Sequence, residues 1–300
     1  MTRFFVIFNP AARGEKSKRV QQLLASKNSE EVRVAHTARA GDATQLAARA
    51  VAEGYHVVVA AGGDGTVNEV VNGLAQSAAA LAILPLGTVN VFARELGIPT
   101  NLDAAWQVAR NGFVRTVDLA VAEAGGTCRY FAQLAGVGFD ARAVRTASWE
   151  LKKRVGPVSY VWAGLKVLRE PPINVDVSVN GNANAARGAA IFVGNGRFYG
   201  GPFRLFPHAR LDDGLLDVCV FERCGYLDVL RYGQGILRGV HTRLPDVRYF
   251  QAKEFVCHAA AAVPFELDGE DAGDAPVKFT VVPRALRVIV PKQVGGNDHA

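Results

Sequence analysis

The chain has 300 residues, of which 49% are hydrophobic and 21% charged, and its formal net charge is +6. This composition is typical of a folded chain long enough for two domains, and it excludes a disordered one. We find no apolar run long enough for a membrane span or a secretory signal core. The positive charge indicates an anionic partner, such as a nucleotide, a membrane surface or nucleic acid, or it serves solubility alone.

The four cysteines form no C-x-x-C pair, and no histidine stands at zinc-ligand spacing from them. This pattern predicts a cytoplasmic protein with reduced thiols.

In the first third of the chain, strand patterns alternate with helix patterns. Strands are predicted at 3–8, 31–36, 56–61 and 81–86, and helices at 16–26, 41–54, 67–75 and 90–97. Continuous apolar strands separated by helices predict a parallel sheet that is covered on both faces. Within the second helix, Asp42 is expected to cap the N-terminus, with Gln45 completing a capping box.

Near Val117 the pattern becomes mainly β. Residues 117–139 predict two strands around a Gly-Gly turn, and a valine at every second position of 175–179 predicts one buried face. A helical interlude is expected over 141–169. We therefore predict an α/β domain at 1–118 and an all-β domain at 119–300, and we leave open a return of the last strand to the first domain.

Gly62-Gly63-Asp64-Gly65-Thr66 follows a predicted strand and precedes a helix. Glycines let backbone N–H groups approach a phosphate, and the positive end of the next helix favours its charge. The loop matches neither G-x-x-x-x-G-K-[ST] nor G-x-G-x-x-G. Asp64 would repel phosphate, so it is expected to hold magnesium or to cap the loop. Taken alone, the segment is more simply explained as a tight turn.

Two further strand ends carry similar chemistry. Gly87, Thr88 and Asn90 follow the strand at 81–86, and Arg13 and Lys16 follow the first strand. Because parallel strands end at one sheet edge, where α/β sheets bind ligands, the Gly87 loop is expected to lie beside the glycine loop at 62–66. Arg13 and Lys16 are candidates for neutralising phosphate charge, although each alone is ordinary loop chemistry.

Several ordered motifs resemble the diacylglycerol kinase catalytic family, which includes bacterial soluble lipid kinases and sphingosine kinases. They are N-P-A-A-R-G at 9–14, G-G-D-G-T-V-N-E-V-V-N-G at 62–73, P-L-G-T-V-N at 85–90, the segment 194–218 containing D-D-G-L-L-D-V, E-L-D-G-E at 266–270 and P-R-A-L-R-V-I-V-P at 283–291. The similarity spans nearly the whole chain. It implies an α/β nucleotide domain and a β-sandwich-like domain with the active site between them.

The resemblance also implies ATP and Mg²⁺ as cofactors and transfer of the γ-phosphoryl group to a lipid hydroxyl. Glu270 matches the proton acceptor, with Asp268 beside it and Asp64 as a third catalytic carboxylate. A structural metal would lie on the Asp213 side chain and the carbonyls of Arg210 and Leu215. The residues implied in nucleotide binding are Asn9, Thr37, Gly62, Gly63, Asp64, Gly65, Thr66, Val67, Asn68, Gly87, Thr88 and Asn90.

The chemistry of these residue types agrees with such roles. Phosphoryl transfer needs positioning and charge neutralisation, and a carboxylate near the acceptor hydroxyl can take its proton. Asp268 and Glu270 would share a face of an extended strand, whereas the glycine between them favours a hairpin turn.

One position departs from the family pattern. Val91 stands where an aspartate commonly follows the asparagine of G-T-x-N, and that aspartate is thought to organise catalytic magnesium. The departure leaves Asp64 as the expected carboxylate on the metal.

Two other functions remain open: an NAD kinase-like small-molecule kinase, and a non-catalytic regulator that binds nucleotide or lipid. Partners are expected to be a lipid alcohol and, peripherally, the membrane surface, with no nucleic acid; a homodimer is left open. Residues 148–170 mix basic and aromatic residues, which indicates either contact with anionic headgroups or an amphipathic helix pair packed on the core.

Overall fold

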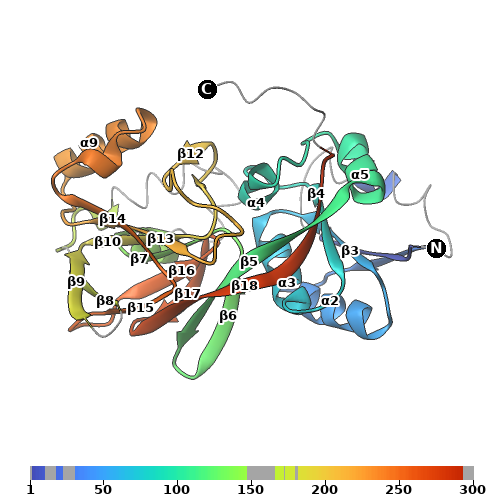
Figure 1. Ribbon diagram of the computed structural model, residues 1–300, viewed down its shortest axis with the longest axis horizontal. Helices are drawn as coiled ribbons and strands as arrows, with labels where there is room; N and C mark the ends of the chain where they lie inside the picture. Colours follow the sequence, from blue (N-terminus) through green and yellow to red (C-terminus); the bar gives the residue numbers. More distant parts are fainter. Residues whose placement is uncertain are drawn as a thin grey trace. The chain divides into compact units, whose positions relative to one another are not determined.

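The structure is a computed structural model that describes residues 2–10, 18–22, 31–146, 166–171, 173–179 and 182–292, without the side chains of 182–184 (Figure 1). The chain divides into two compact units. Unit 1 comprises Met1–Val117 and Arg284–Ala300, and unit 2 comprises Asp118–Pro283. Strands β5 (Phe113–Ala124) and β18 (Val277–Val290) each run from one unit into the other. No helix in the described part of the chain is long and apolar enough to cross a membrane.

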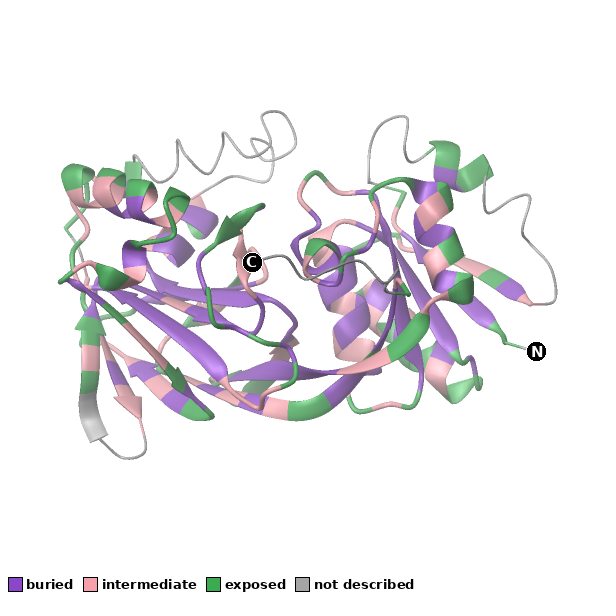
Figure 2. Cartoon of the chain, turned by 45° about the horizontal axis from the view of Figure 1, so that its top comes forward, coloured by how far each residue is buried: buried purple, intermediate pink, exposed green. Residues whose placement is uncertain are grey.

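Unit 1 is built on a parallel sheet with strand order β2-β1-β3-β4-β18. The strands are β1 (Phe4–Phe8), β2 (Val32–His36), β3 (Val57–Gly62) and β4 (Ala80–Pro85), completed by the end of β18. Every residue of β1, β3 and β4 is buried (Figure 2), as expected for a parallel sheet whose two faces are both covered. The predicted parallel α/β architecture is confirmed.

The helices of unit 1 are α2 (Asp42–Ala52), α3 (Asp64–Leu74), α4 (Val91–Glu95) and α5 (Leu102–Asn111). Helix α5 was not predicted from sequence, although its start carries a recognisable signal. The Asn101 side chain accepts the N–H of Ala104 at 3.0 Å, which is an ordinary N-cap. Four residues on one side of the helix, Leu102, Ala105, Trp106 and Ala109, are buried.

The predicted cap of α2 is wrong. Gly41, in the left-handed region at φ 85°, is the N-cap residue, and Asp42 turns back to accept the N–H groups of Ala38 and Arg39. The side chain that caps α2 comes from α3 instead. Glu69 accepts the N–H of Gly41 at 2.9 Å and of Ala43 at 3.0 Å, which joins the two helices.

Unit 2 is antiparallel. One sheet has the order β14-β13-β10-β7-β16-β17, and a second group of strands has the order β18-β15-β8-β9, with β5 pairing with β18 and β6. The predicted all-β second domain, like a β-sandwich, is confirmed. The strands are β6 (Thr127–Phe131), β7 (Leu134–Gly138), β8 (Val175–Val179), β9 (Asn182–Gly188), β10 (Ala190–Gly194), β11 (Phe198–Tyr199), β12 (Phe203–Arg204), β13 (Leu216–Phe221), β14 (Val247–Ala252), β15 (Glu254–His258), β16 (Pro264–Leu267) and β17 (Glu270–Asp274).

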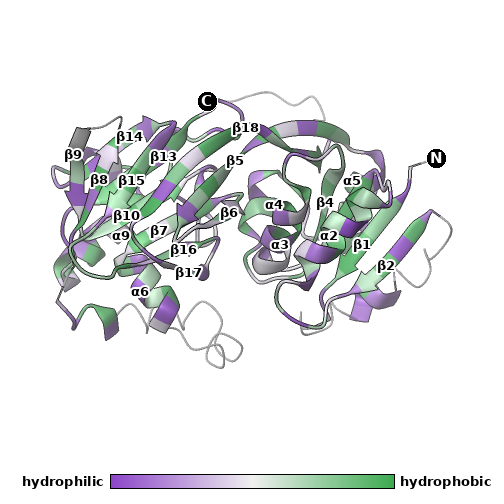
Figure 3. Cartoon of the chain, turned by 90° about the horizontal axis from the view of Figure 1, so that it is seen from below, coloured by the Kyte–Doolittle hydropathy of each residue, from purple (hydrophilic) through white to green (hydrophobic). Residues whose placement is uncertain are grey.

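The core of unit 2 lies between the two groups of strands. Val175 and Val177 are fully buried in it and Val179 packs against it, which confirms their shared face. Figure 3 shows the alternation of hydrophobic and hydrophilic residues along such strands.

Residues 117–139 form three strands rather than the predicted two. The extra break falls at Ala132 and Gln133, whose N–H groups turn toward the Asp268 side chain.

Unit 2 also contains helices α6 (Phe139–Thr146) and α9 (Tyr226–Leu237) and the short η1 (His241–Arg243). Helix α9 was not predicted from sequence. Of the interlude expected at 141–169, the structure describes 141–146 and 166–169, so most of the basic and aromatic segment at 148–170 lies outside the described residues. Arg13 and Lys16 lie outside them as well.

Candidate functional site

The glycine loop at the end of β3 leads directly into helix α3. Gly63 is the N-cap residue, and Asp64, Gly65 and Thr66 form the first helical turn. The first N–H groups of any helix lack acceptors within the helix, and the helix dipole adds positive potential there. At Gly62, a Cβ atom would come within 2.5 Å of the Thr66 side chain, so the loop can follow this path only with glycine. This helix start offers an anion several backbone donors.

The loop after β4 lies against the glycine loop. A Cβ added to Gly87 would be 2.8 Å from the Cα of Gly63, so the two backbones touch at this point. Asn90, in the left-handed region at φ 52°, closes the second loop. Its Oδ1 accepts the N–H of Gly87 at 3.0 Å, and its Nδ2 donates to the Gly87 carbonyl at 2.7 Å. The prediction that these two strand ends lie side by side is confirmed.

Asp64 connects the two loops through hydrogen bonds. Its carboxylate accepts the backbone N–H of Asn90 at 2.9 Å and of Val91 at 2.6 Å, at the start of α4. The sequence predicted either metal binding or capping for Asp64, and in the structure its carboxylate caps the start of α4. The catalytic and magnesium-holding roles of Asp64 stay predictions. The Val91 side chain is buried, so this position contributes only its backbone.

The first strand adds Asn9 to this group. Its Nδ2 donates to the Thr66 hydroxyl at 3.0 Å, and its backbone N–H binds the Ala61 carbonyl. Thr37, at the end of β2, pairs through its N–H with the Phe8 carbonyl on the neighbouring strand, and Thr88 is exposed. The side chains of Val67 and Asn68 are buried within α3.

In unit 2, Asp268 and Gly269 form a two-residue hairpin turn between β16 and β17. Their φ angles, 48° and 86°, are those of a type I′ turn, which Asp-Gly favours. The Asp268 carboxylate accepts three backbone N–H groups, from Ala132, Gln133 and Leu134, at 3.0, 3.1 and 2.9 Å. The interpretation of this motif as a hairpin turn is therefore confirmed, and Asp268 connects the turn to residues 132–134, at the start of β7.

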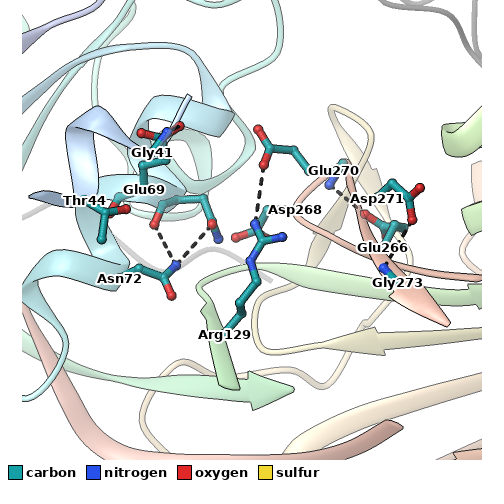
Figure 4. Close-up of polar contacts among 12 residues, drawn as sticks. Gly41, Thr44, Glu69, Asn72, Arg129, Glu266, Asp268, Glu270, Asp271 and Gly273 are labelled. Carbon is teal, nitrogen blue, oxygen red and sulfur yellow. Dashed lines mark hydrogen bonds and ion pairs between the residues drawn. The ribbon is translucent and has the colours of Figure 1, made fainter. Parts of the chain in front are cut away.

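Glu270 follows the turn, with its side chain 47% exposed, and the Arg129 guanidinium lies 3.4 Å from its carboxylate (Figure 4). Of the two predicted acidic residues in this motif, Glu270 is the one whose carboxylate faces solvent.

A second acidic cluster surrounds the D-D-G-L-L-D segment. Asp213 Oδ1 accepts the N–H of Leu215 at 3.0 Å, and Asp118 Oδ2 accepts that of Gly214 at 2.8 Å. Burial, together with the nearby charge of Asp118, raises the pKa of Asp213 above its ordinary value. Arg210 forms an ion pair with Asp212 at 3.5 Å. Within the described residues, no three His, Cys, Asp or Glu side chains gather as metal ligands, so a metal here would depend on backbone carbonyls as the sequence reading has it.

Sequence reasoning missed Asp140, Glu266 and Asp118, all of which are buried. Glu266 belongs to the quoted E-L-D-G-E motif, and an acidic residue in an otherwise apolar strand could have been noticed. Asp118, within the apolar run at 117–121, carries the same signal as Glu266, whereas Asp140 carries none, because only the tertiary fold buries it.

Comparison with known proteins agrees with this architecture. Residues 3–122 match the model of the diacylglycerol kinase catalytic domain, and residues 133–290 match that of the YegS C-terminal NAD kinase beta sandwich-like domain. A diacylglycerol kinase of Staphylococcus aureus (strain bovine RF122 / ET3-1) is 33% identical over 98% of this chain and 96% of its own length. A diacylglycerol kinase of Staphylococcus saprophyticus is 31% identical over 98% and 97%.

Among solved structures, a putative diacylglycerol kinase from Bacillus anthracis str. Sterne superposes with a TM-score of 0.79 at 24% identity, covering 98% of this chain and 96% of that one. The sequence similarity to the two family models covers both units, and the chain shares the fold of the solved structure. The chain therefore belongs to the diacylglycerol kinase catalytic family, and it is a lipid kinase.

Proposed function

We propose that this protein transfers the γ-phosphoryl group of ATP to the hydroxyl of diacylglycerol or a related lipid alcohol. The observation that supports it best is the pair of loops joined by Asp64, which presents the start of α3 beside the Gly87 loop. The glycine contacts leave no room for side chains where the two backbones meet. Such a surface of backbone donors suits a polyphosphate.

ATP, when bound, supplies the phosphoryl group and its leaving group. The residues proposed to hold it are those of unit 1 named above, chiefly Gly63, Gly65 and Thr66 with Gly87 and Asn90. Asn9 holds the Thr66 side chain in place through its 3.0 Å hydrogen bond, so it acts by positioning.

Glu270 is proposed to accept the proton of the lipid hydroxyl. A general base must reach the hydroxyl, and the exposed carboxylate of Glu270 can do so, while the Asp268 oxygens are occupied by backbone N–H groups. Asp268 is thus a positioning residue in this proposal. Arg129, whose guanidinium lies 3.4 Å from the Glu270 carboxylate, is proposed to hold that carboxylate in position.

Magnesium, when bound, would neutralise phosphate charge. Asp64 is the carboxylate proposed for the catalytic ion, because Val91 offers none. The Asp213 carboxylate is proposed for a structural ion with the carbonyls of Arg210 and Leu215. The repulsion between Asp118 and Asp213 fits a place where a cation would be favourable.

Contact with a membrane surface is proposed for helix α9. Leu227, Leu230 and Leu237 fall on one side of the helix and are 81%, 59% and 71% exposed. The exposed cations nearby, Arg223, Arg238 and Arg243, form no ion pair with any described residue. Exposed leucines flanked by arginines suit an anionic lipid surface.

The homodimer, which the sequence analysis left open, stays a prediction.

The function is tested by incubating the protein with γ-labelled ATP, Mg²⁺ and a total lipid extract, and identifying labelled products by mass spectrometry. We expect a phosphorylated diacylglycerol or a related lipid. Glu270→Gln should abolish transfer while ATP binding, measured by calorimetry, is retained. Turnover of NAD without any lipid product, or ATP binding without turnover over a broad lipid panel, would contradict the proposal.

A further inference from the structure

A pair of buried carboxyl groups lies directly beneath the turn that carries Glu270. Asp140, in the first turn of α6, is 9% exposed, and Glu266, on β16, is 1% exposed. The Tyr199 hydroxyl donates to Asp140 Oδ1, and the Gly269 N–H donates to Glu266 Oε2 at 2.6 Å. One oxygen of each carboxyl group is therefore satisfied by a neutral donor.

The two remaining oxygens point at the same place. A Cβ atom on Gly136 of β7 would lie 2.5 Å from Asp140 Oδ2 and 3.0 Å from Glu266 Oε1. Both oxygens are inaccessible to solvent, and neither has a hydrogen-bond donor among the described residues. Because a carboxylate only accepts, a hydrogen bond between these two facing oxygens requires a proton on one of the two side chains.

Among the residues that the structure describes, no cation forms an ion pair with either carboxyl group. The strands that pack most closely on α6 are β7, β10, β16 and β17, and β7 and β10 carry no titratable side chain. The charged groups of α6 and β17 are engaged elsewhere: Arg142 with Glu170, Arg145 with Asp271 and Asp274, and Glu270 with Arg129. Asp268 and Tyr199 are the other titratable neighbours in the described part of the chain, and the charge of Asp268 repels a second anion.

Burial and the charge of Asp140 raise the pKa of Glu266 well above its ordinary value, and burial also raises that of Asp140. Two carboxylates in contact inside a protein cannot both ionise at low cost, so such pairs retain one proton. A shared proton satisfies both inward-facing oxygens at once.

The Asp140–Glu266 pair is connected to Glu270, the proposed base, through Gly269. Glu266 Oε2 holds the N–H of Gly269, and Glu270 is the next residue in the chain. Asp268 secures the other side of the turn. We propose that Asp140 and Glu266 share a single proton and act as positioning residues, which lock the start of α6 to the Asp268–Gly269 turn and thereby orient Glu270.

The part of this inference that concerns Glu270 rests on the proposed function, whereas the shared proton does not. The first experiment therefore uses infrared spectroscopy of the whole protein near pH 7. We expect a carbonyl band of a protonated, buried carboxyl group that disappears in both Asp140→Asn and Glu266→Gln. Asp246 is the matched control: it is also buried, but Tyr232 and Arg231 stabilise its charge and lower its pKa, so Asp246→Asn should leave the band unchanged. Absence of the band in the unaltered protein would overturn the shared proton.

The second experiment compares Glu266→Gln with Glu266→Ala in phosphoryl transfer. The amide of glutamine can donate to Asp140 while its oxygen still accepts from Gly269, so Glu266→Gln should keep kcat within about threefold. Glu266→Ala removes both contacts and should lower kcat by roughly 100-fold at unchanged KM for ATP, as expected for a misplaced catalytic group. Equal kcat values for the two variants, both folded by circular dichroism, would overturn the positioning role.

Discussion

The Asp64 carboxylate accepts the backbone N–H of Val91 at 2.6 Å, so a residue of the glycine loop caps the helix that follows the next strand. Together with the bond to Asn90, this contact holds two loops whose backbones touch at Gly63 and Gly87. Asp64 therefore has a structural role that does not depend on any metal.

Replacing Asp64 with alanine should destabilise the protein even without nucleotide and magnesium. Two backbone donors would lose their acceptor, at a cost of about 1–3 kcal/mol. Urea unfolding in the presence of a chelator measures this loss. Unaltered stability would mean that other contacts hold the loops. If Asp64 also carries magnesium, the variant should in addition lose the magnesium-dependent part of its ATP affinity.

Gly87→Ala should weaken ATP binding by separating the two loops. The new methyl group would lie 2.8 Å from the Gly63 Cα and 2.9 Å from Asn90 Oδ1, and such overpacking costs about 1–3 kcal/mol. Calorimetric titration with ATP gives the affinity. Gly233→Ala is the matched control, because a Cβ there meets no atom within 4 Å and alanine favours helix. Equal affinities for the two variants would contradict the prediction.

Asp268→Ala should be more destabilising than Asp268→Asn. Both lose charge, but asparagine keeps a carbonyl oxygen for the N–H groups of Ala132, Gln133 and Leu134, and it tolerates the left-handed φ of 48° better than alanine does. We expect alanine to cost about 2–4 kcal/mol in unfolding free energy, because buried donors lose their acceptor. Chemical denaturation of both variants provides the comparison, and the reverse order would contradict it.

Glu266 should make stability depend on pH with a definite sign. Its folded-state pKa is raised above the ordinary value of 4.5, so the folded protein binds one more proton than the unfolded chain between the two pKa values. The unfolding free energy should therefore fall as pH rises above 4.5, by up to about 1.4 kcal/mol per unit, until the raised pKa is passed. In Glu266→Gln this slope should vanish. Parallel pH profiles for the two proteins would contradict the assignment.

Helix α9 should mediate binding to anionic vesicles. The double variant Leu227→Ser/Leu230→Ser should lower the binding of phosphatidylglycerol vesicles roughly tenfold or more, since burying one leucine contributes about 1.5–3 kcal/mol. Flotation assays measure the bound fraction, and phosphatidylcholine vesicles should bind weakly. Phe113→Ser/Val114→Ser, which alters exposed apolar residues of β5, is the control. Equal binding by both double variants would exclude α9 as the contact.

The strands and loops of unit 1 could be predicted from the sequence because each depends on residues close together in the chain. Apolar runs predicted β1, β3 and β4, and glycines after β3 and β4 marked the two loops. The cap of α2 could not be predicted, because it depends on Glu69, a residue 26–28 positions away that only packing against α3 brings near. Helix α5 has a local signal in the cap at Asn101. Helix α9 lies in a β-rich region, where tertiary packing supplies most of a helix's stability.

By itself, the sequence determined the two fold classes, the membership in a lipid kinase family and the loops expected to contact phosphate. The fold classes follow from hydrophobic periodicity and the loops from glycines at strand ends, whereas the family follows from the resemblance of the ordered motifs. Only the tertiary structure decided what each acidic residue does: Asp64 caps, Asp268 anchors a turn, Glu270 stays exposed, and Asp140 meets Glu266. The physical reason is that a carboxyl group's role depends on its burial and on the donors around it, and those come from parts of the chain far apart in sequence.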